Sequence, residues 1–315
     1  MNARAEAGER VGGRYDARVL EPSPPAVAAE PWLADDPVGR DEPRGALPRL
    51  APVPGGDLRW RELVAQDASL AQWCADRWLA AYRDLQPAPA TLVATRQALH
   101  SLAERVIAPA RQAANGKIGL RFTRGGFGTP FFGADAQVRV AGEQLVVQQG
   151  GQERAEPIAS LAQAAAHLGE QLLPGGVAGE DAGDELAVGA AASTLLGEWY
   201  GFGASVLEEL RAGVGDEAEP SRVQLWPEHF DLSVELGAEA EGKRAGYGAS
   251  PGDELHAEPY LYVTPWSEQP DGELWQASAF RGAELSYAEL LSGDCGERQR
   301  EIALRFFAER LAALS

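Results

Sequence analysis

The stretch Phe230–Leu236, FDLSVEL, decides the fold class, because its side chains alternate strictly between apolar and polar. On an extended chain its four apolar side chains fall on one face and its three polar side chains on the other. This pattern predicts a strand that is buried on one face only. After the polar turn 237–242, Lys243–Ala249 predicts a neighbouring antiparallel strand, and Tyr260–Thr264 predicts another.

Elements outside this strand region indicate an α+β fold. Further strands are expected at 117–123, 137–140 and 144–148, the last two forming a hairpin. Apolar residues at spacings of three and four predict helices, with Ser160 as a helix N-cap and Gly116 as a helix stop. Because helices and strands do not alternate regularly, we expect a largely antiparallel sheet with flanking helices. The predicted helices cover 57–86, 92–115, 160–173, 184–211 and 297–314.

Two predicted helices contain residues that can interrupt them. Pro109 can kink or shorten the helix over 92–115, since proline lacks the backbone N–H that a helix interior requires. Gly201 and Gly203 can break the helix over 184–211, since each glycine weakens a helix interior by roughly 1 kcal/mol.

Residues 1–56 differ in composition from the rest of the chain. They hold nine of the 21 prolines, and their apolar residues follow neither a helical nor an alternating period. Proline restricts its own backbone and that of the preceding residue, so this segment is predicted to be a disordered or extended arm. Residues 57–315 are predicted to form a single domain.

The chain is acidic, with 47 Asp and Glu against 28 Lys and Arg and a formal charge of −19. Such a surface repels the phosphates of nucleic acids and anionic membranes. No stretch approaches the ~20 continuous apolar residues that cross a bilayer. The first residues are polar and lack a secretory pattern. We therefore expect a cytoplasmic protein that binds neither nucleic acid nor membranes.

The segment 225–266 contains two of the four histidines, each with carboxylates beside it. Histidine and carboxylate side chains bind divalent metals and act as general acids and bases. One hypothesis is therefore a metal-dependent enzyme of hydrolase or lyase type. Alternatively, these acids cap turns and the histidines bond to backbone carbonyls. The candidate metal ligands are His229, Asp231, Asp253 and His256, and the candidate catalytic bases are Glu228 and Glu258.

A small-molecule pocket is the first hypothesis for function, because aromatic residues accompany these polar groups. The Gly-aromatic loop 125–133 permits close backbone approach, and its Phe residues can line an apolar pocket. The alternative is that this loop is a tight turn, with its Phe residues and the strand aromatics packed in the core. The candidate ligand-binding residues are Phe127, Thr129, Phe131, Trp226, Tyr260 and Tyr262.

Gly248–Gly252 matches the GxSxG pattern of serine hydrolases, but that motif needs a helix directly after the serine. Pro251–Gly252 predicts a β-turn there instead, which argues against a serine hydrolase.

A third hypothesis for function is an interaction protein whose arm or acidic face engages a basic partner.

Three segments together resemble a family of uncharacterised actinobacterial proteins. They are ANGKIGLRFTRGGFGTPFFG at 114–133, SRVQLWPEHFDLSVELG at 221–237 and YGASPGDELHAEPYLYVTPW at 247–266. The resemblance covers most of residues 57–315 and excludes the arm. A fainter similarity links the second and third segments to a broader group of domains of unknown function. The resemblance implies no activity, cofactor or catalytic residue.

Overall fold

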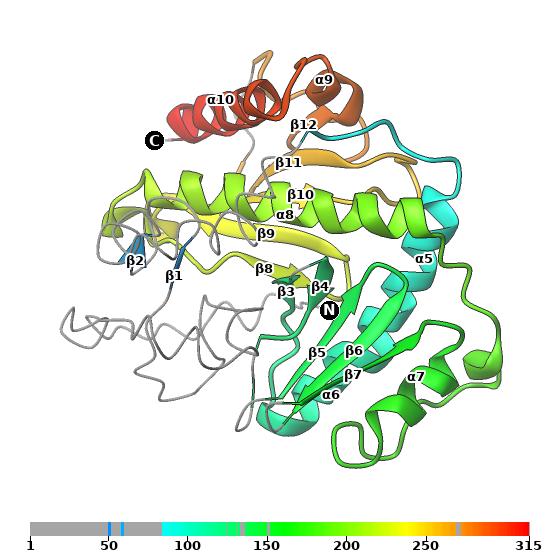
Figure 1. Ribbon diagram of the computed structural model, residues 1–315. Coiled ribbons are helices and arrows are strands. Elements are labelled where there is room, and N and C mark those ends of the chain that lie inside the picture. The colour runs from blue at the N-terminus through cyan, green and yellow to red at the C-terminus, as the bar shows by residue number, and fades with distance from the viewer. Residues whose placement is uncertain are drawn as a thin grey trace.

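The computed structural model describes residues 50–51, 58–59, 84–123, 125–130, 132, 136–149, 152–268 and 272–314. The predicted arm and the predicted helix over 57–86 lie almost entirely outside these residues. Within them the α+β class is confirmed, because two five-stranded antiparallel sheets combine with helices (Figure 1). Two short strands, β1 (Leu50–Ala51) and β2 (Leu58–Arg59), form a separate parallel pair.

The first sheet contains β3 to β7 in chain order. Its central hairpin, β5 with β6, confirms the hairpin expected from the sequence. The expected strand over 117–123 is shorter, and part of the Gly-aromatic loop forms β4. At Gly126 and Gly128 a Cβ atom would overlap the carbonyl oxygens of Val140 and Val138, so glycine allows β4 to approach β5. The strands are β3 (Arg121–Thr123), β4 (Gly126–Gly128), β5 (Gln137–Ala141), β6 (Gln144–Gln149) and β7 (Gln152–Pro157).

The second sheet has the order β12-β11-β10-β9-β8. The antiparallel pairing of β9 with β10 and of β10 with β11 confirms the strands predicted around Phe230–Leu236. A bridge between Leu120 and Leu225 connects the edges of the two sheets. The strands are β8 (Gln224–Trp226), β9 (Asp231–Leu236), β10 (Ala245–Ser250), β11 (Tyr260–Pro265) and β12 (Ala283–Ser286).

Helical residues run without interruption from α5 (Leu92–Leu102) through the π-helical segment η4 (Ala103–Ile107) to α6 (Ala108–Asn115). The wider π-helical turn ends two residues before Pro109, whose missing N–H cannot join a regular α-helical ladder. Gly116 ends α6 with φ at 77°, as the sequence predicted. Proline is thus accommodated inside a helical segment that continues past it.

The remaining helices pack around the two sheets. Ser160 caps α7 by accepting a hydrogen bond from the Gln163 N–H, which confirms the predicted N-cap. The α-helices are α7 (Leu161–Leu168), α8 (Ala190–Ala212), α9 (Tyr287–Leu291) and α10 (Gly296–Leu314). Short 3-10 helices are η5 (Glu180–Gly183), η6 (Asp216–Ala218) and η7 (Glu239–Glu241). None of the helices described combines the length and apolar character that crossing a membrane requires.

Helix α8 packs against strands of both sheets and is unbroken, so the suggested interruption at Gly201–Gly203 is wrong (Figure 1). A Cβ atom at Gly203 would lie 2.8 Å from the Ala249 Cβ, and one at Gly197 would lie 2.8 Å from the Gly125 oxygen. These glycines therefore serve close contact between the helix and the sheets. Tertiary packing outweighs the helix-weakening tendency of glycine.

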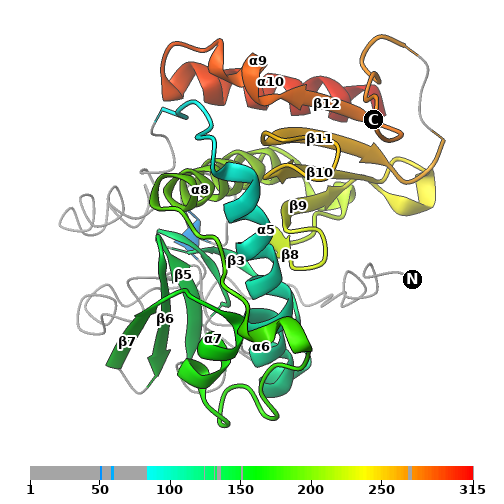
Figure 2. The ribbon, with the colours of Figure 1, turned by 90° about the vertical axis from the view of Figure 1, so that its right-hand side faces the viewer.

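The second sheet has one covered face and one polar face. Helices α8 and α10 cover the face that buries Leu232, Val234 and Leu261 (Figure 2). Residues that pair directly across antiparallel strands have their side chains on the same face of the sheet. The strand register therefore shows which residues lie on the opposite face. We call it the outer face; it comprises Gln224, Trp226, Asp231, Ser233, Glu235, Gly246, Gly248, Ser250, Tyr260, Tyr262, Thr264, Glu284 and Ser286.

Candidate functional site

The outer face brings a tyrosine of β11 to a carboxylate of β9 across the intervening strand. The Tyr262 hydroxyl donates a hydrogen bond to Asp231 Oδ2. Gly248 of β10 pairs with Tyr262 on one side and Ser233 on the other. A Cβ atom at Gly248 would overlap the Tyr262 ring, so the glycine leaves the space that the ring occupies. The absence of a side chain at Gly248 therefore lets Tyr262 reach across β10 to Asp231.

The Asp231 carboxyl group is buried, and only one of its two oxygens, Oδ2, accepts a side-chain hydrogen bond from a described residue. The residue is 7% exposed, and Oδ1 has no hydrogen-bond partner in the part of the chain that the structure describes. Burial raises the pKa of Asp231, while the Tyr262 hydrogen bond and the charge of His229 oppose this and Glu228 adds to it. A buried acceptor without a partner costs roughly 1–3 kcal/mol, so this oxygen calls for a physical explanation.

A strained turn sets the position of Asp231. Phe230, directly before it, has φ at 56°, which is unfavourable for a bulky residue and costs on the order of 1–3 kcal/mol. The Tyr200 hydroxyl of α8 donates to the Phe230 oxygen at 2.7 Å. His100 of α5 stacks on the Phe230 ring at 5.1 Å, and its Nε2 lies 2.8 Å from the Pro227 oxygen. Two helices therefore hold the turn in this conformation.

The same turn carries Glu228, whose Oε2 is also buried without a hydrogen-bond partner among the described residues. Glu228 lies in the turn between Trp226 and Asp231, which pair directly across β8 and β9, and its charge raises the pKa of Asp231. Trp226 lies on the outer face beside them, and its Nε1 donates to Ser233 Oγ at 3.0 Å. The end of β8 thus supplies a fixed aromatic ring next to two carboxyl groups.

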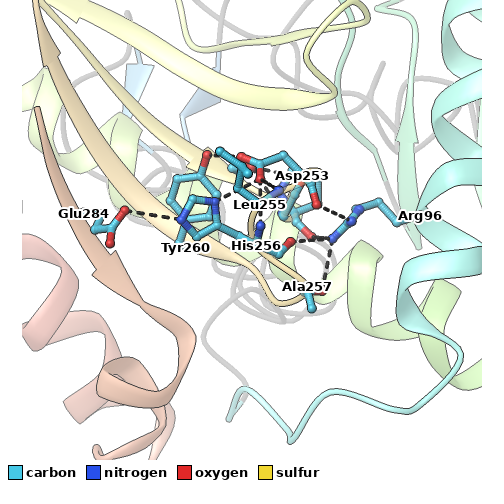
Figure 3. Close-up of polar contacts among 10 residues, drawn as sticks. Arg96, Asp253, Leu255, His256, Ala257, Tyr260 and Glu284 are labelled. Carbon is cyan, nitrogen blue, oxygen red and sulfur yellow. Dashed lines mark hydrogen bonds and ion pairs between the residues drawn. The ribbon is translucent and has the colours of Figure 1, made fainter. Parts of the chain in front are cut away.

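Asp253 organises a second group of contacts in the loop between β10 and β11 (Figure 3). Its Oδ1 accepts from the backbone N–H groups of Leu255 at 2.7 Å and His256 at 2.8 Å, and lies 2.9 Å from His256 Nδ1. Its Oδ2 accepts from the Tyr260 hydroxyl at 2.7 Å. The His256 ring packs on Tyr260 at 4.3 Å, and its Nε2 lies 3.4 Å from Glu284 Oε2. His256 therefore links this loop to β12.

Arg96 of α5 fixes the same loop from the opposite side (Figure 3). The residue is 6% exposed. Its Nη2 donates to the backbone carbonyl oxygen of Asp253 at 2.8 Å. Its Nη1 lies within 3.3 Å of three carbonyl oxygens, those of Pro251, His256 and Ala257. Burial lowers the pKa of Arg96, and the negative charge of Asp253 opposes this. Sequence reasoning missed this residue, because an arginine on a helix carries no motif.

The predicted ligand-binding residues divide between the core and the outer face. Phe127, 1% exposed, packs between the rings of Tyr200 and Phe230. Thr129, fully buried, accepts a hydrogen bond from the Val138 N–H at 3.0 Å. Phe131 lies outside the described residues. The other predicted residues, Trp226, Tyr260 and Tyr262, lie together on the outer face.

The four predicted metal ligands fall into different surroundings. Asp253 and His256 bond to each other, Asp231 bonds to Tyr262, and His229 is exposed. Within the described ranges no three His, Cys, Asp or Glu side chains are grouped to hold a metal ion. The predicted base Glu258 is exposed before β11, whereas Glu228 lies beside Asp231. The structure therefore offers no support for a shared metal centre.

Comparison with known proteins adds no further information about the site. No family model matches the chain, and no curated protein or solved structure matches it. Both ring nitrogens of His256 already face carboxylates, and Ser250 Oγ accepts from the Gly252 N–H at 3.2 Å. Asp231 Oδ1 and Glu228 Oε2 are buried acceptors that no described residue bonds to, so they remain open to a new donor.

The contacts of Asp253 predict how stability depends on pH. Burial raises the pKa of this carboxyl group, but hydrogen bonds from Tyr260, His256 and two backbone N–H groups outweigh it and leave the pKa lowered. The resulting stabilisation is fully present above the unfolded-state pKa of about 3.9 and is lost as pH falls through the lower folded-state value.

Asp253→Asn should therefore lower the free energy of unfolding by about 1 kcal/mol at neutral pH, a modest value because the carboxylate is partly exposed. The difference from the unsubstituted protein should shrink on acidification through the pKa of Asp253. Urea unfolding at several pH values measures this. The exposed neighbour Glu254→Gln is the matched control and should change little. A pH-independent difference would show that the carboxylate charge does not matter.

Proposed function

We propose that this protein binds a small molecule on the outer face of the second sheet, with Asp231 as the polar anchor. The observation that carries this proposal is Asp231 Oδ1, a buried carboxylate oxygen without a hydrogen-bond partner among the described residues. Native structures pair their buried polar atoms, and exceptions are concentrated at functional sites and at positions occupied by water or ligand. A ligand that donates to Oδ1 would complete the pairing.

The surroundings of Asp231 have further properties of a binding site. Trp226 and Tyr262 are half-buried on the same face, so their rings are available for apolar contact. Ligand sites commonly combine aromatic side chains with a few fixed polar groups. The strain at Phe230 supports the same conclusion, because such strain persists only where surrounding contacts enforce it and is concentrated at functional positions.

The other functional hypotheses have less support. A metal-dependent enzyme needs a free base and a group of ligands, yet His256 already faces Asp253 and Glu284. An interaction protein for a basic partner rests on the overall charge of −19 alone. Neither hypothesis accounts for the buried Asp231 oxygen that lacks a hydrogen-bond partner among the described residues. Small-molecule binding does, since the ligand supplies the missing donor.

The proposal can be tested by adding a fragment library of amines, carboxylates and neutral alcohols to the isotope-labelled protein and recording amide chemical shifts. We expect binding fragments to perturb the amides of Asp231, Ser233, Gly248 and Tyr262. Tyr262→Phe keeps the ring but removes the hydroxyl group that orients Asp231, so it should weaken this binding. Fragments that consistently perturb another part of the domain and leave these amides unchanged would contradict the proposal.

A further inference from the structure

Resting on the site proposed above, we infer that its ligand carries a positively charged amine that donates hydrogen bonds to Asp231 and Glu228. Three features of the site favour an amine: the acceptors left without partners, the charges around them, and the aromatic rings beside them.

The unpaired atoms near Asp231 are acceptors. Asp231 Oδ1 and Glu228 Oε2 are both buried and lack hydrogen-bond partners among the described residues. An ionised carboxylate only accepts hydrogen bonds, so each oxygen requires a donor from outside. An ammonium group carries three N–H donors and no acceptor. Such a group can serve both carboxylates, and the resulting charge-assisted bonds are the stronger class.

The charges around Asp231 favour a cation over an anion. The charged neighbours that act on its pKa are Glu228, which raises it, and His229, which lowers it and is exposed. The buried guanidinium of Arg96 donates to carbonyl oxygens of the loop after β10, so these donors are already engaged. An anionic ligand would be repelled by the two carboxylates. A cation would instead be attracted by both carboxylates and would offset the cost of burying the Asp231 charge.

Aromatic rings complete a surface suited to a cation. The ring centroids of Tyr260 and Tyr262 lie 6.2 Å apart, and Phe280 lies 6.2 Å from Tyr262. Trp226 shares the outer face with both tyrosines. The faces of such rings attract cations by roughly 0.5–2 kcal/mol, more strongly where water is excluded. An amine with an aryl or alkyl group would therefore meet both carboxylates and rings.

A bound divalent metal explains these features less well. A metal ion needs several ligands in fixed geometry, and in the described part no three His, Cys, Asp or Glu side chains are grouped for one. The Tyr262 hydroxyl also occupies Asp231 Oδ2 as a hydrogen-bond donor. One free oxygen from each of two acids suits hydrogen-bond donors better than a coordination shell.

The test uses three probes that share a ring and differ in charge: benzylammonium, benzyl alcohol and benzoate. Each is titrated into the full-length protein, and its affinity is read from the outer-face amides. We expect benzylammonium to bind at least about tenfold more tightly than benzyl alcohol, a difference of about 1.4 kcal/mol. Benzoate should bind most weakly.

Two variants connect this preference to the carboxylates. Asp231→Asn should fold, because its amide oxygen can still accept from Tyr262 and a neutral group avoids the cost of a buried charge. It should lose the preference for benzylammonium, whereas the exposed control Glu254→Gln should retain it. If Asp231→Asn does not fold, Glu228→Gln provides the same comparison, with an expected partial loss of the preference.

The outcomes separate the ligand class from the site itself. If benzyl alcohol or benzoate perturbs the same amides with equal or higher affinity, the amine assignment is overturned and the site stands. If benzylammonium does not bind there at millimolar concentration, the amine assignment is also overturned. In that case the proposed site is judged by whether the other fragment classes perturb the outer face.

Discussion

Replacing Arg96 with alanine is expected to lower the free energy of unfolding by about 3–5 kcal/mol, the largest effect of any substitution proposed for this protein. The guanidinium group is buried and serves the carbonyl oxygens of Pro251, Asp253, His256 and Ala257. Alanine would remove this donor from all four oxygens, of which the His256 oxygen still accepts from the Asp253 N–H at 2.9 Å. A buried acceptor that is left without a partner is costly. The effect can be measured by urea unfolding monitored by circular dichroism.

Two further substitutions make the Arg96 measurement specific. Arg96→Lys retains the positive charge but lacks the planar fork that reaches several oxygens at once, so it should recover only part of the stability. Arg105→Ala removes an arginine whose partner Asp181 is largely exposed, and it should cost at most about 1 kcal/mol. A loss at Arg96 no larger than the loss at Arg105 would show that the loop does not depend on this side chain.

Replacing Gly248 with alanine is expected to have the second largest effect. The added methyl group would overlap the Tyr262 ring, which must then leave its position across β10. Overpacking of this kind typically costs about 1–3 kcal/mol. Displacement of the ring also removes the hydrogen bond from Tyr262 to Asp231. The variant should therefore lose both stability and fragment binding at the outer face.

The strand offers a matched control for this substitution. Gly246 lies on the same face of β10, but a Cβ atom there would be 3.1 Å from Thr264 Oγ1 and away from the tyrosine ring. Gly246→Ala should therefore cost much less than Gly248→Ala. In a Tyr262→Ser background the cost of Gly248→Ala should largely disappear, because the clashing ring is gone. An equal cost in both backgrounds would contradict this explanation.

The sheet region could be predicted from the sequence because alternation is a local signal. The apolar positions of Phe230–Leu236 are buried in the core. The predicted strand at 243–249 pairs antiparallel with it, and the one at 260–264 pairs antiparallel with that strand in turn. The structural role of a glycine is harder to predict, because whether it ends an element or allows close packing depends on residues distant in sequence. Gly126 lies in a strand and Gly203 lies in an uninterrupted helix. In both cases glycine allows close contact that its local propensity does not indicate.

The candidate site was recognised in part. The sequence indicates Asp231 as a candidate metal ligand and Trp226 and Tyr262 as candidate ligand-binding residues. All three lie on the outer face. Which hydroxyl reaches which carboxylate could not be foreseen, because it depends on strand register and on the open space above Gly248. The role of Arg96 depends on the docking of a helix against a distant loop, which no local pattern encodes.

The most direct test of the central claim is the map of amide chemical-shift changes that benzylammonium produces in the full-length protein. We expect the largest changes at Asp231, Ser233, Gly248 and Tyr262, and we expect Asp231→Asn to abolish them. Saturable binding whose changes lie elsewhere, and which is unaffected by Asp231→Asn, would show that the buried carboxylate of Asp231 is not a ligand site.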